Sequence, residues 1–181
     1  MLCGIDEAGR GCIAGDMVVA GVVLNSSIDG LMDSKKLSEK RREILYEVIV
    51  ENANYHIVSF SPEDIDKLGI SKCLSQALEE IKAHFKESDI LFDGNSSFGV
   101  DGIETMIKAD TKIAEVSGAS ILAKVTRDRA INQDALLYPN YKFEKHKGYG
   151  TKAHIEAIKE YGYTPIHRRS FRLKALEEIN K

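Results

Sequence analysis

Apolar runs of strand length are separated by polar or glycine-rich segments along this chain. Aliphatic, β-branched or alternating runs occur at five places: Met1–Asp6, Met17–Leu24, Tyr55–Phe60, Ile90–Phe92 and Thr105–Lys108. Each run predicts a strand. The first two runs flank a segment that contains Gly9, Gly11 and Gly15, so we expect these strands to pair around a tight turn.

Longer stretches carry apolar residues at the three- and four-residue spacing of helices. We expect Ser38 to cap the first helix and Ser61-Pro62-Glu63 to open the second. Four further helices are predicted near Leu74–Phe85, Ile113–Leu136, Lys152–Glu160 and Phe171–Ile179. Small residues from Ser117 to Ser120 would let the longest helix lie close against a sheet. Strands with interleaved helices predict an α/β domain with a mixed sheet.

Composition places few limits on this picture. The 181 residues, with 43% hydrophobic and 29% charged residues, are typical of one globular domain spanning residues 1–181. The longest apolar run, Met17–Leu24, is too short to cross a bilayer, and no leader segment precedes it, so we expect a cytoplasmic protein that does not bind membranes. Cys3, Cys12 and Cys73 match no metal-ligand spacing and are expected to be free thiols.

The net charge of −3 is unevenly distributed. From Asn140 to Lys181 there are ten Lys and Arg against five Glu, an excess of five positive charges, which leaves −8 on the rest of the chain. A basic segment attracts phosphate backbones through counterion release, and acidic clusters hold divalent metals. The alternative is a solvated pair of C-terminal helices that binds nothing.

Acidic residues follow three of the predicted strands. Asp6 and Glu7 end the first strand, Asp93 follows Ile90–Phe92, and Asp110 follows the strand near Thr105. Carboxylates gathered at one sheet edge would repel one another unless cations lie between them, and oxygen ligands favour Mg²⁺ or Mn²⁺. Two such ions could catalyse phosphodiester hydrolysis. Taken singly, each acid could instead be a turn former or a helix cap.

Several short segments resemble the type 2 ribonuclease H family, in particular bacterial ribonuclease HII. They occur in the family's order and span residues 4 to 171: Gly4-Ile5-Asp6-Glu7-Ala8-Gly9-Arg10-Gly11, Asp33-Ser34-Lys35-Lys36-Leu37, Phe92-Asp93-Gly94-Asn95 with Lys108-Ala109-Asp110, Ala119–Asp128, His146–Thr151 and His167–Phe171. The resemblance implies a ribonuclease H-like fold: a five-stranded mixed β-sheet flanked by helices, with a small helical C-terminal portion. It also implies an endonuclease that cuts the RNA strand of RNA–DNA hybrids and incises 5′ of single ribonucleotides in duplex DNA. Such an enzyme would leave 3′-OH and 5′-phosphate ends, and would serve ribonucleotide excision repair and RNA primer removal.

The resemblance also implies roles for individual residues. Asp6, Glu7, Asp93 and Asp110 match the four catalytic acids that bind two Mg²⁺ or Mn²⁺ ions. Gly9, Arg10 and Gly11 match the loop that senses the 2′-OH, and Tyr149 matches the tyrosine near the sugar of the following deoxynucleotide. Residues in motifs associated with phosphate contact are Lys35, Lys36, Lys147, Arg168 and Arg169. We expect a monomer whose partner is nucleic acid.

Two positions depart from the family pattern. Cys12 and Asp16 stand where the family often has proline, so we expect a looser turn and an added negative charge near the metal site. The chain begins almost at its first strand, which favours the type 2 enzymes over the type 3 enzymes with their N-terminal extension.

Other readings remain open. A hybrid-binding module without turnover would keep the same surface, and a resolvase or transposase core would share strand-end acids but not Gly9-Arg10-Gly11 with Tyr149. Asp128 is expected to be an exposed helical acid paired with nearby bases, and Lys124 to lie either near the acids or on a solvated face. The histidines of the basic segment, His146, His154 and His167, are expected to bond to backbone or phosphate rather than to metal.

Overall fold

The sheet has five strands and mixed directions. The computed structural model describes residues 1–31 and 37–172. Its strands are β1 (Leu2–Ala8), β2 (Met17–Leu24), β3 (Ala53–Phe60), β4 (Asp89–Asp93) and β5 (Ile103–Met106). They lie in the order β3-β2-β1-β4-β5, with β1–β2 and β2–β3 antiparallel and β1–β4 and β4–β5 parallel. The predicted α/β class with a mixed five-stranded sheet is confirmed.

The helices follow most of the predicted segments. They are α1 (Glu39–Asn52), α2 (Pro62–Leu68), α3 (Ile70–His84), α4 (Ala114–Leu137), α5 (Phe143–His146) and α6 (Lys152–Tyr161). Ser38 caps α1 by accepting a hydrogen bond from the Arg41 amide, and Ser61 forms a capping box with Asp64 at the start of α2. Both predicted helix starts are confirmed. The single turn α5 was not predicted, because four residues carry too little periodicity to identify a helix.

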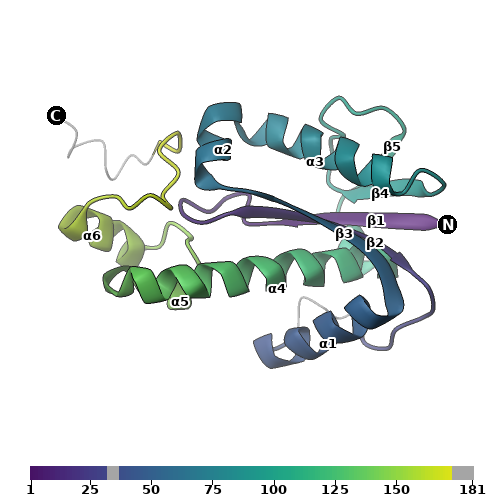
Figure 1. Ribbon diagram of the computed structural model, residues 1–181, viewed down its shortest axis with the longest axis horizontal. Helices are drawn as coiled ribbons and strands as arrows, with labels where there is room; N and C mark the ends of the chain where they lie inside the picture. Colours follow the sequence, from purple (N-terminus) through teal and green to yellow (C-terminus); the bar gives the residue numbers. More distant parts are fainter. Residues whose placement is uncertain (32–36, 173–181) are drawn as a thin grey trace.

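Two layers of helices cover the sheet, and the side-chain alternation of β2 explains why. Met17, Val19 and Val23 point into a core shared with α2 and α3, whereas Val18, Ala20 and Val22 point into a core shared with α1 and α4. Figure 1 shows the sheet nearly edge-on between these two layers. Because β2 is buried on both faces, its sequence is a continuous apolar run.

The long helix α4 lies against β1 as the small residues predicted. A Cβ atom on Gly4 of β1 would lie 2.3 Å from the backbone nitrogen of Val116 in α4, so only glycine fits there. Gly118 of α4 faces Val22 of β2. This close packing places the carboxyl end of β1 beside the middle of α4.

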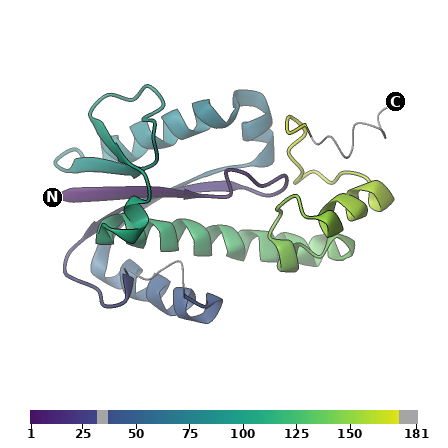
Figure 2. The ribbon, with the colours of Figure 1, turned by 180° about the vertical axis from the view of Figure 1, so that it is seen from behind.

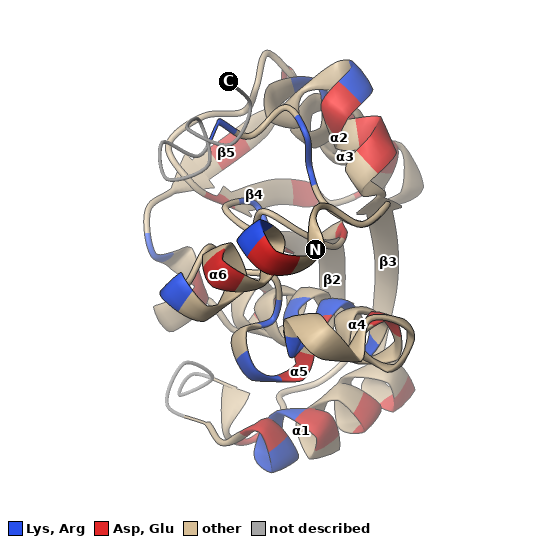
Figure 3. Ribbon diagram, turned by 90° about the vertical axis from the view of Figure 1, so that its left-hand side faces the viewer, with Lys and Arg blue, Asp and Glu red and all other residues tan. Residues whose placement is uncertain are grey.

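The short helices α5 and α6 lie together beyond one end of the sheet, as Figure 2 shows from behind. They pack with the end of α4 around Phe143, Tyr141 and Ile158. Figure 3 views this end directly; acidic residues are interspersed with the basic ones there, rather than leaving a uniformly basic face. Phe171 and Arg172 are not helical, and the rest of the predicted last helix lies outside the described residues. Among the described helices, none combines the length and the apolar character needed to cross a bilayer.

Candidate active site

The carboxyl ends of β1 and β4 bring two of the predicted acids together. Ile5 of β1 pairs with Phe92 of β4 in parallel register, so the next residues, Asp6 and Asp93, lie side by side. Asp6 accepts a hydrogen bond from the Glu7 amide (2.8 Å), and Asp93 accepts one from the Ala109 amide (3.2 Å). These bonds fix both carboxylates at the sheet end.

Asp110 completes the cluster from a different kind of element. Strand β5 ends at Met106, and Asp110 lies in the 3₁₀ turn Ala109–Thr111, after Lys108 in a left-handed conformation (φ 59°). The expectation that Asp110 directly follows a strand is therefore wrong. The turn nevertheless brings a carboxylate oxygen of fully buried Asp110 within 4.8 Å of ligand oxygens of both Asp6 and Asp93.

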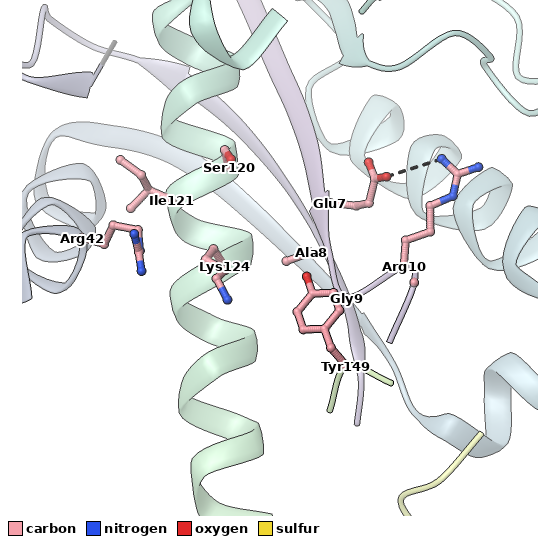
Figure 4. Close-up of a pocket in the computed structure, with 10 residues that line it drawn as sticks. Glu7, Ala8, Gly9, Arg10, Arg42, Ser120, Ile121, Lys124 and Tyr149 are labelled. Atoms are coloured by element: carbon pink, nitrogen blue, oxygen red, sulfur yellow. Dashed lines mark ion pairs between the residues drawn. The ribbon is translucent and has the colours of Figure 1, made fainter. Parts of the chain in front are cut away.

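Glu7, the fourth predicted acid, points elsewhere. Because strand residues alternate, Glu7 points away from α4, and Figure 4 shows its carboxylate directed toward Arg10. The Oε1 atom lies 3.5 Å from Nη1 of Arg10. The other oxygen, Oε2, is buried and has no hydrogen-bond partner in the described part of the chain. Three of the four predicted acids thus form one cluster, and the fourth lies beside it.

Burial makes this cluster electrostatically unfavourable as it stands. Desolvation raises the pKa of Asp6 to about 8, against a weaker lowering effect of a hydrogen bond from Ser120. Burial also raises the pKa of Asp93, with the neighbouring acid Asp110 as a further cause, and it raises the pKa of Glu7 against the effect of Arg10. Within residues 1–31 and 37–172, neither Asp6 nor Asp93 forms an ion pair with Lys or Arg.

The donor set fits a hard divalent cation. Three carboxylates converge within 4.8 Å, they offer oxygen ligands only, and the buried Oε2 of Glu7 next to them lacks a donor from the described residues. Cations between the carboxylates would remove their mutual repulsion, and Mg²⁺ or Mn²⁺ prefers such ligands.

A pocket of about 390 Å³ opens beside the acids, between the end of β1 and α4. Figure 4 shows Tyr149 and Lys124 facing it from opposite sides. The lining residues are Glu7, Ala8, Gly9, Arg10, Gly11, Arg42, Ser120, Ile121, Lys124 and Tyr149. The predicted 2′-OH loop and the predicted junction tyrosine therefore line one pocket together with one of the acids.

The two glycines of this loop differ in what the fold requires. Gly9 has φ +86°, and a Cβ there would lie 2.1 Å from Nε of Arg127, so the fold itself demands glycine. A Cβ on Gly11 would meet nothing within 4 Å, and its φ lies outside the left-handed range. The fold therefore gives no reason for glycine at Gly11, although this residue lines the pocket.

Two buried arginines hold the turn that follows the loop. Arg127 is 1% exposed and donates to the carbonyls of Asp16 (3.0 Å) and Lys147 (2.8 Å). Arg168, also 1% exposed, donates to the carbonyls of Gly15 (2.8 and 3.0 Å) and Arg10 (3.2 Å). Because backbone acceptors enclose its guanidinium, a phosphate contact of Arg168, which stays a prediction, would have to replace these partners.

Cys12 and Asp16 occupy the positions where the family often has proline. The Cys12 amide donates to the Gly9 carbonyl (3.2 Å), a bond that proline could not make and that closes the turn. The main charged groups acting on Asp16 are Asp134, Arg168 and Arg127, and not the clustered acids. All three cysteines are free, as predicted, and all three are buried.

The remaining predicted phosphate contacts fall into three groups. Lys35 and Lys36 lie outside the described residues. The Lys147 ammonium bonds Asn132 (2.6 Å) and lies 3.6 Å from Glu39, so a phosphate contact would have to replace these partners. Arg169 is exposed over the ring of Tyr163 and stays a candidate.

The pocket also contains groups that were missed or left undecided in the sequence. Arg42 was missed, because nothing in a helix of mixed charge shows which cation faces a pocket. Lys124 lines the pocket and pairs with Asp128 (2.7 Å), which is only 6% exposed. Asp128 is thus paired as expected, but the prediction that it is exposed is wrong. Ser120 was noted only as a small residue, yet it lines the pocket and its hydroxyl lowers the pKa of Asp6.

Comparisons with known proteins identify the family of this chain. A family model described as ribonuclease HII matches residues 3–174. A protein of Sulfurovum sp. (strain NBC37-1) named ribonuclease HII is 65% identical over 177 residues, which cover 98% of this chain and 94% of that protein. Another protein of that name, from Campylobacter jejuni subsp. jejuni (strain 81-176), is 58% identical and covers 95% and 91%.

A solved structure gives the same fold. The chain in the PCNA:RNase HII complex from Archaeoglobus fulgidus superposes with a TM-score of 0.82 at 31% identity and covers 96% of each chain. The family model spans nearly the whole chain and includes all four predicted acids. This chain belongs to the ribonuclease HII family, the endoribonucleases that hydrolyse the RNA strand of RNA–DNA hybrids.

Proposed function

We propose that this endoribonuclease also incises duplex DNA at a single embedded ribonucleotide. The cut would fall on the 5′ side of the ribonucleotide and leave a 3′-OH and a 5′-phosphate. Such an activity would serve the removal of ribonucleotides from DNA and of RNA primers. The observation that carries the proposal is the common pocket, because Glu7, the Gly9–Gly11 loop and Tyr149 all line it.

Divalent ions would be held by Asp6, Asp93 and Asp110, with Glu7 beside them. When bound, two ions would supply Lewis-acid stabilisation of the attacking and leaving oxygens in phosphodiester hydrolysis. The contribution of the chain is to keep the carboxylates fixed through the amides of Glu7 and Ala109. The enclosed position of Asp6 also strengthens its interaction with cations, since few waters screen it.

Recognition of the 2′-OH is assigned to the Gly9–Gly11 loop. Its backbone groups offer polar contacts, and the missing Cβ at Gly11 would permit close approach of a sugar or phosphate. A substrate without the hydroxyl would leave such contacts unpaired. A site of this kind can reject the deoxy analogue by about 10⁴- to 10⁵-fold.

Tyr149 would mark the junction with the following deoxynucleotide. Its side chain is 46% exposed and lines the pocket, so a ring face is available to a sugar. Lys124 and Arg42, on the α4 and α1 side of the same pocket, are placed to approach phosphate groups of the bound strand.

The test is cleavage of three labelled duplexes in Mg²⁺: a long RNA–DNA hybrid, a DNA duplex with one ribonucleotide, and an all-DNA duplex. We expect cleavage of the first two, with the second cut only on the 5′ side of the ribonucleotide. End-group analysis should give a 3′-OH and a 5′-phosphate. Efficient cleavage of the all-DNA duplex would exclude recognition of the 2′-OH. Cleavage of the hybrid alone would exclude the single-ribonucleotide activity.

A glycine pair tests the loop directly. Gly11→Ala should leave the unfolding temperature unchanged, because the new Cβ has free space, and should lower kcat/KM on the single-ribonucleotide duplex roughly tenfold. Gly118→Ala, in α4 and away from the pocket, is the matched control and should leave kcat/KM at the wild-type value. Equal activities of the two variants would remove the loop from the recognition site.

A further inference from the structure

Two buried histidines lie behind Tyr149 and join it to the C-terminal segment. His154 of α6 is fully buried, and His167 is 2% exposed. Their Nε2 atoms lie 3.0 Å apart, a hydrogen-bond distance between two imidazoles. Such a contact requires one ring to donate and the other to accept, so the protonation of both rings is constrained.

The neighbouring groups decide which ring donates. The Thr164 amide donates to Nδ1 of His167 (2.9 Å), so the proton of His167 must lie on Nε2. His167 then donates to Nε2 of His154, and the proton of His154 must lie on Nδ1. That Nδ1 lies 2.9 Å from the Tyr149 carbonyl, which can only accept. A single chain of donors thus runs from Thr164 through both imidazoles to Tyr149.

The surroundings keep both rings neutral. His146 stacks on His154 with ring centroids 4.4 Å apart, and Phe143 meets His154 edge to face at 5.3 Å. Burial lowers the pKa of both His154 and His167 to about 4. In the described part of the chain, neither imidazole forms an ion pair with an acid.

Each end of this hydrogen-bonded series, from Thr164 to Tyr149, reaches one side of the pocket. The Tyr149 carbonyl also accepts from the Thr151 amide (2.8 Å), so it has two donors that fix its direction. At the other end, His167 forms a β-bridge with Ala14, and the next residue, Arg168, binds the carbonyls of Arg10 and Gly15. The imidazole pair therefore connects the backbone of Tyr149 with the segment that holds the 2′-OH loop.

We propose that His154 is a positioning residue for Tyr149. Its Nδ1–H fixes the Tyr149 carbonyl, and His167 fixes the tautomer of His154. The pair thereby sets the position of the tyrosine ring relative to the Gly9–Gly11 loop, on which discrimination of an RNA–DNA junction depends. This inference rests on the proposed role of Tyr149.

Two substitutions separate positioning from folding. The side-chain amide of asparagine lies where Nδ1 of histidine lies, and that of glutamine lies where Nε2 lies. His154→Asn therefore keeps the donor to Tyr149 and loses the contact with His167, whereas His154→Gln keeps the contact with His167 and loses the donor to Tyr149. Each variant loses one buried hydrogen bond, so both should have similarly lowered unfolding temperatures.

The readout is the ratio of kcat/KM on the single-ribonucleotide duplex to that on a long hybrid. We expect His154→Gln to lower this ratio roughly five- to tenfold, in the direction of Tyr149→Ala, and His154→Asn to keep it within about twofold of wild type. A ratio lowered equally by both variants, or by neither while Tyr149→Ala lowers it, would overturn the positioning role. If Tyr149→Ala leaves the ratio unchanged, the proposed junction reading by Tyr149 fails, and the functional part of this inference fails with it.

A measurement on the wild-type protein tests the hydrogen-bond chain from Thr164 to Tyr149 without relying on activity or on the folding of variants. Long-range ¹H–¹⁵N spectra of the imidazoles at neutral pH should show His154 protonated on Nδ1 and His167 protonated on Nε2. The reverse tautomers, or a charged ring in either histidine, would exclude the proposed donor chain even if the three duplexes are cut as expected.

Discussion

The carboxylates of Asp6 and Asp93 lie at the ends of two strands, whereas the guanidinium groups of Arg127 and Arg168 are enclosed by backbone carbonyls. Asp6 is 9% exposed and each arginine is 1% exposed, whereas Asp93 is partly buried. The arginines receive acceptors from the β1–β2 turn and from Lys147. The aspartates receive one backbone amide each, and no cation from the described residues pairs with them.

This difference distinguishes a structural charge from a functional one. All three guanidinium nitrogens of Arg168 donate to backbone carbonyls, so this buried cation is satisfied within the fold. In Arg127, Nε and Nη2 donate to carbonyls, and Nη1 lies 3.9 Å from the Asp128 carboxylate. Buried acids gathered within 4.8 Å of one another are stabilised only when a cation joins them. Burial is therefore compatible with either role, and the partners decide between them.

The largest effect should come from removing a cluster acid. Asp6→Asn or Asp93→Asn should lower the cleavage rate in Mg²⁺ by at least about 10³-fold, because metal stabilisation of the transition state is lost, while duplex binding persists. Glu104→Gln, at an exposed acid of β5, is the control and should cleave at the wild-type rate. Near-normal cleavage by either aspartate variant would mean that the cluster is not the metal site.

The next largest effect is a difference between substitutions of the adjacent residues Arg168 and Arg169. Arg168→Ala should destabilise the protein by about 3 kcal/mol or more, because the carbonyls of Gly15 and Arg10 lose their buried donors. Arg169→Ala should change the unfolding free energy little and should flatten the salt dependence of duplex binding, as expected for an exposed phosphate contact. Denaturant unfolding and binding titrations at several salt concentrations measure both effects. A large loss of stability in Arg169→Ala together with a flattened salt dependence in Arg168→Ala would contradict the distinction between a structural and an exposed arginine.

Divalent ions should stabilise the fold through the acids. Mg²⁺ or Mn²⁺ at about 100 times its dissociation constant should raise the free energy of unfolding by about 2.7 kcal/mol, since the ions bind only the folded cluster. A thermal shift assay with and without chelator measures this effect. The shift should be lost in Asp93→Asn and retained in Arg169→Ala. A full shift in Asp93→Asn would place the ions elsewhere.

The last effect concerns pH and the histidine pair. The folded pKa values of His154 and His167 are about 4, below the ordinary value of 6.5, so the unfolded chain binds more protons between these limits. Their stabilising contribution is complete above pH 6.5 and is lost as the pH falls toward 4. Each histidine contributes a slope of at most about 1.4 kcal/mol per pH unit. Denaturant unfolding of His154→Gln from pH 7 to 4 should show a flatter slope than wild type, and an equal slope would show that His154 does not titrate in this range.

The sequence alone predicted most of the strands and helices and the acids of the proposed site. Local signals were sufficient for the continuous apolar run of β2, the N-caps at Ser38 and Ser61, and the small residues of α4, because each depends on neighbours close in the sequence. The four acids could be identified because they belong to short motifs, and the fold then brought three of them together.

Only the tertiary structure decided which basic side chains line the pocket and which are buried in the fold. Arg168 and Arg169 are adjacent in the sequence and equally basic, yet one is buried against carbonyls of a turn about 150 residues away and the other is exposed. The same holds for Arg42 and Lys124, which come from different helices to one pocket. A long flexible cation can turn toward solvent, substrate or backbone, and the choice depends on acceptors that the chain brings near only when it folds.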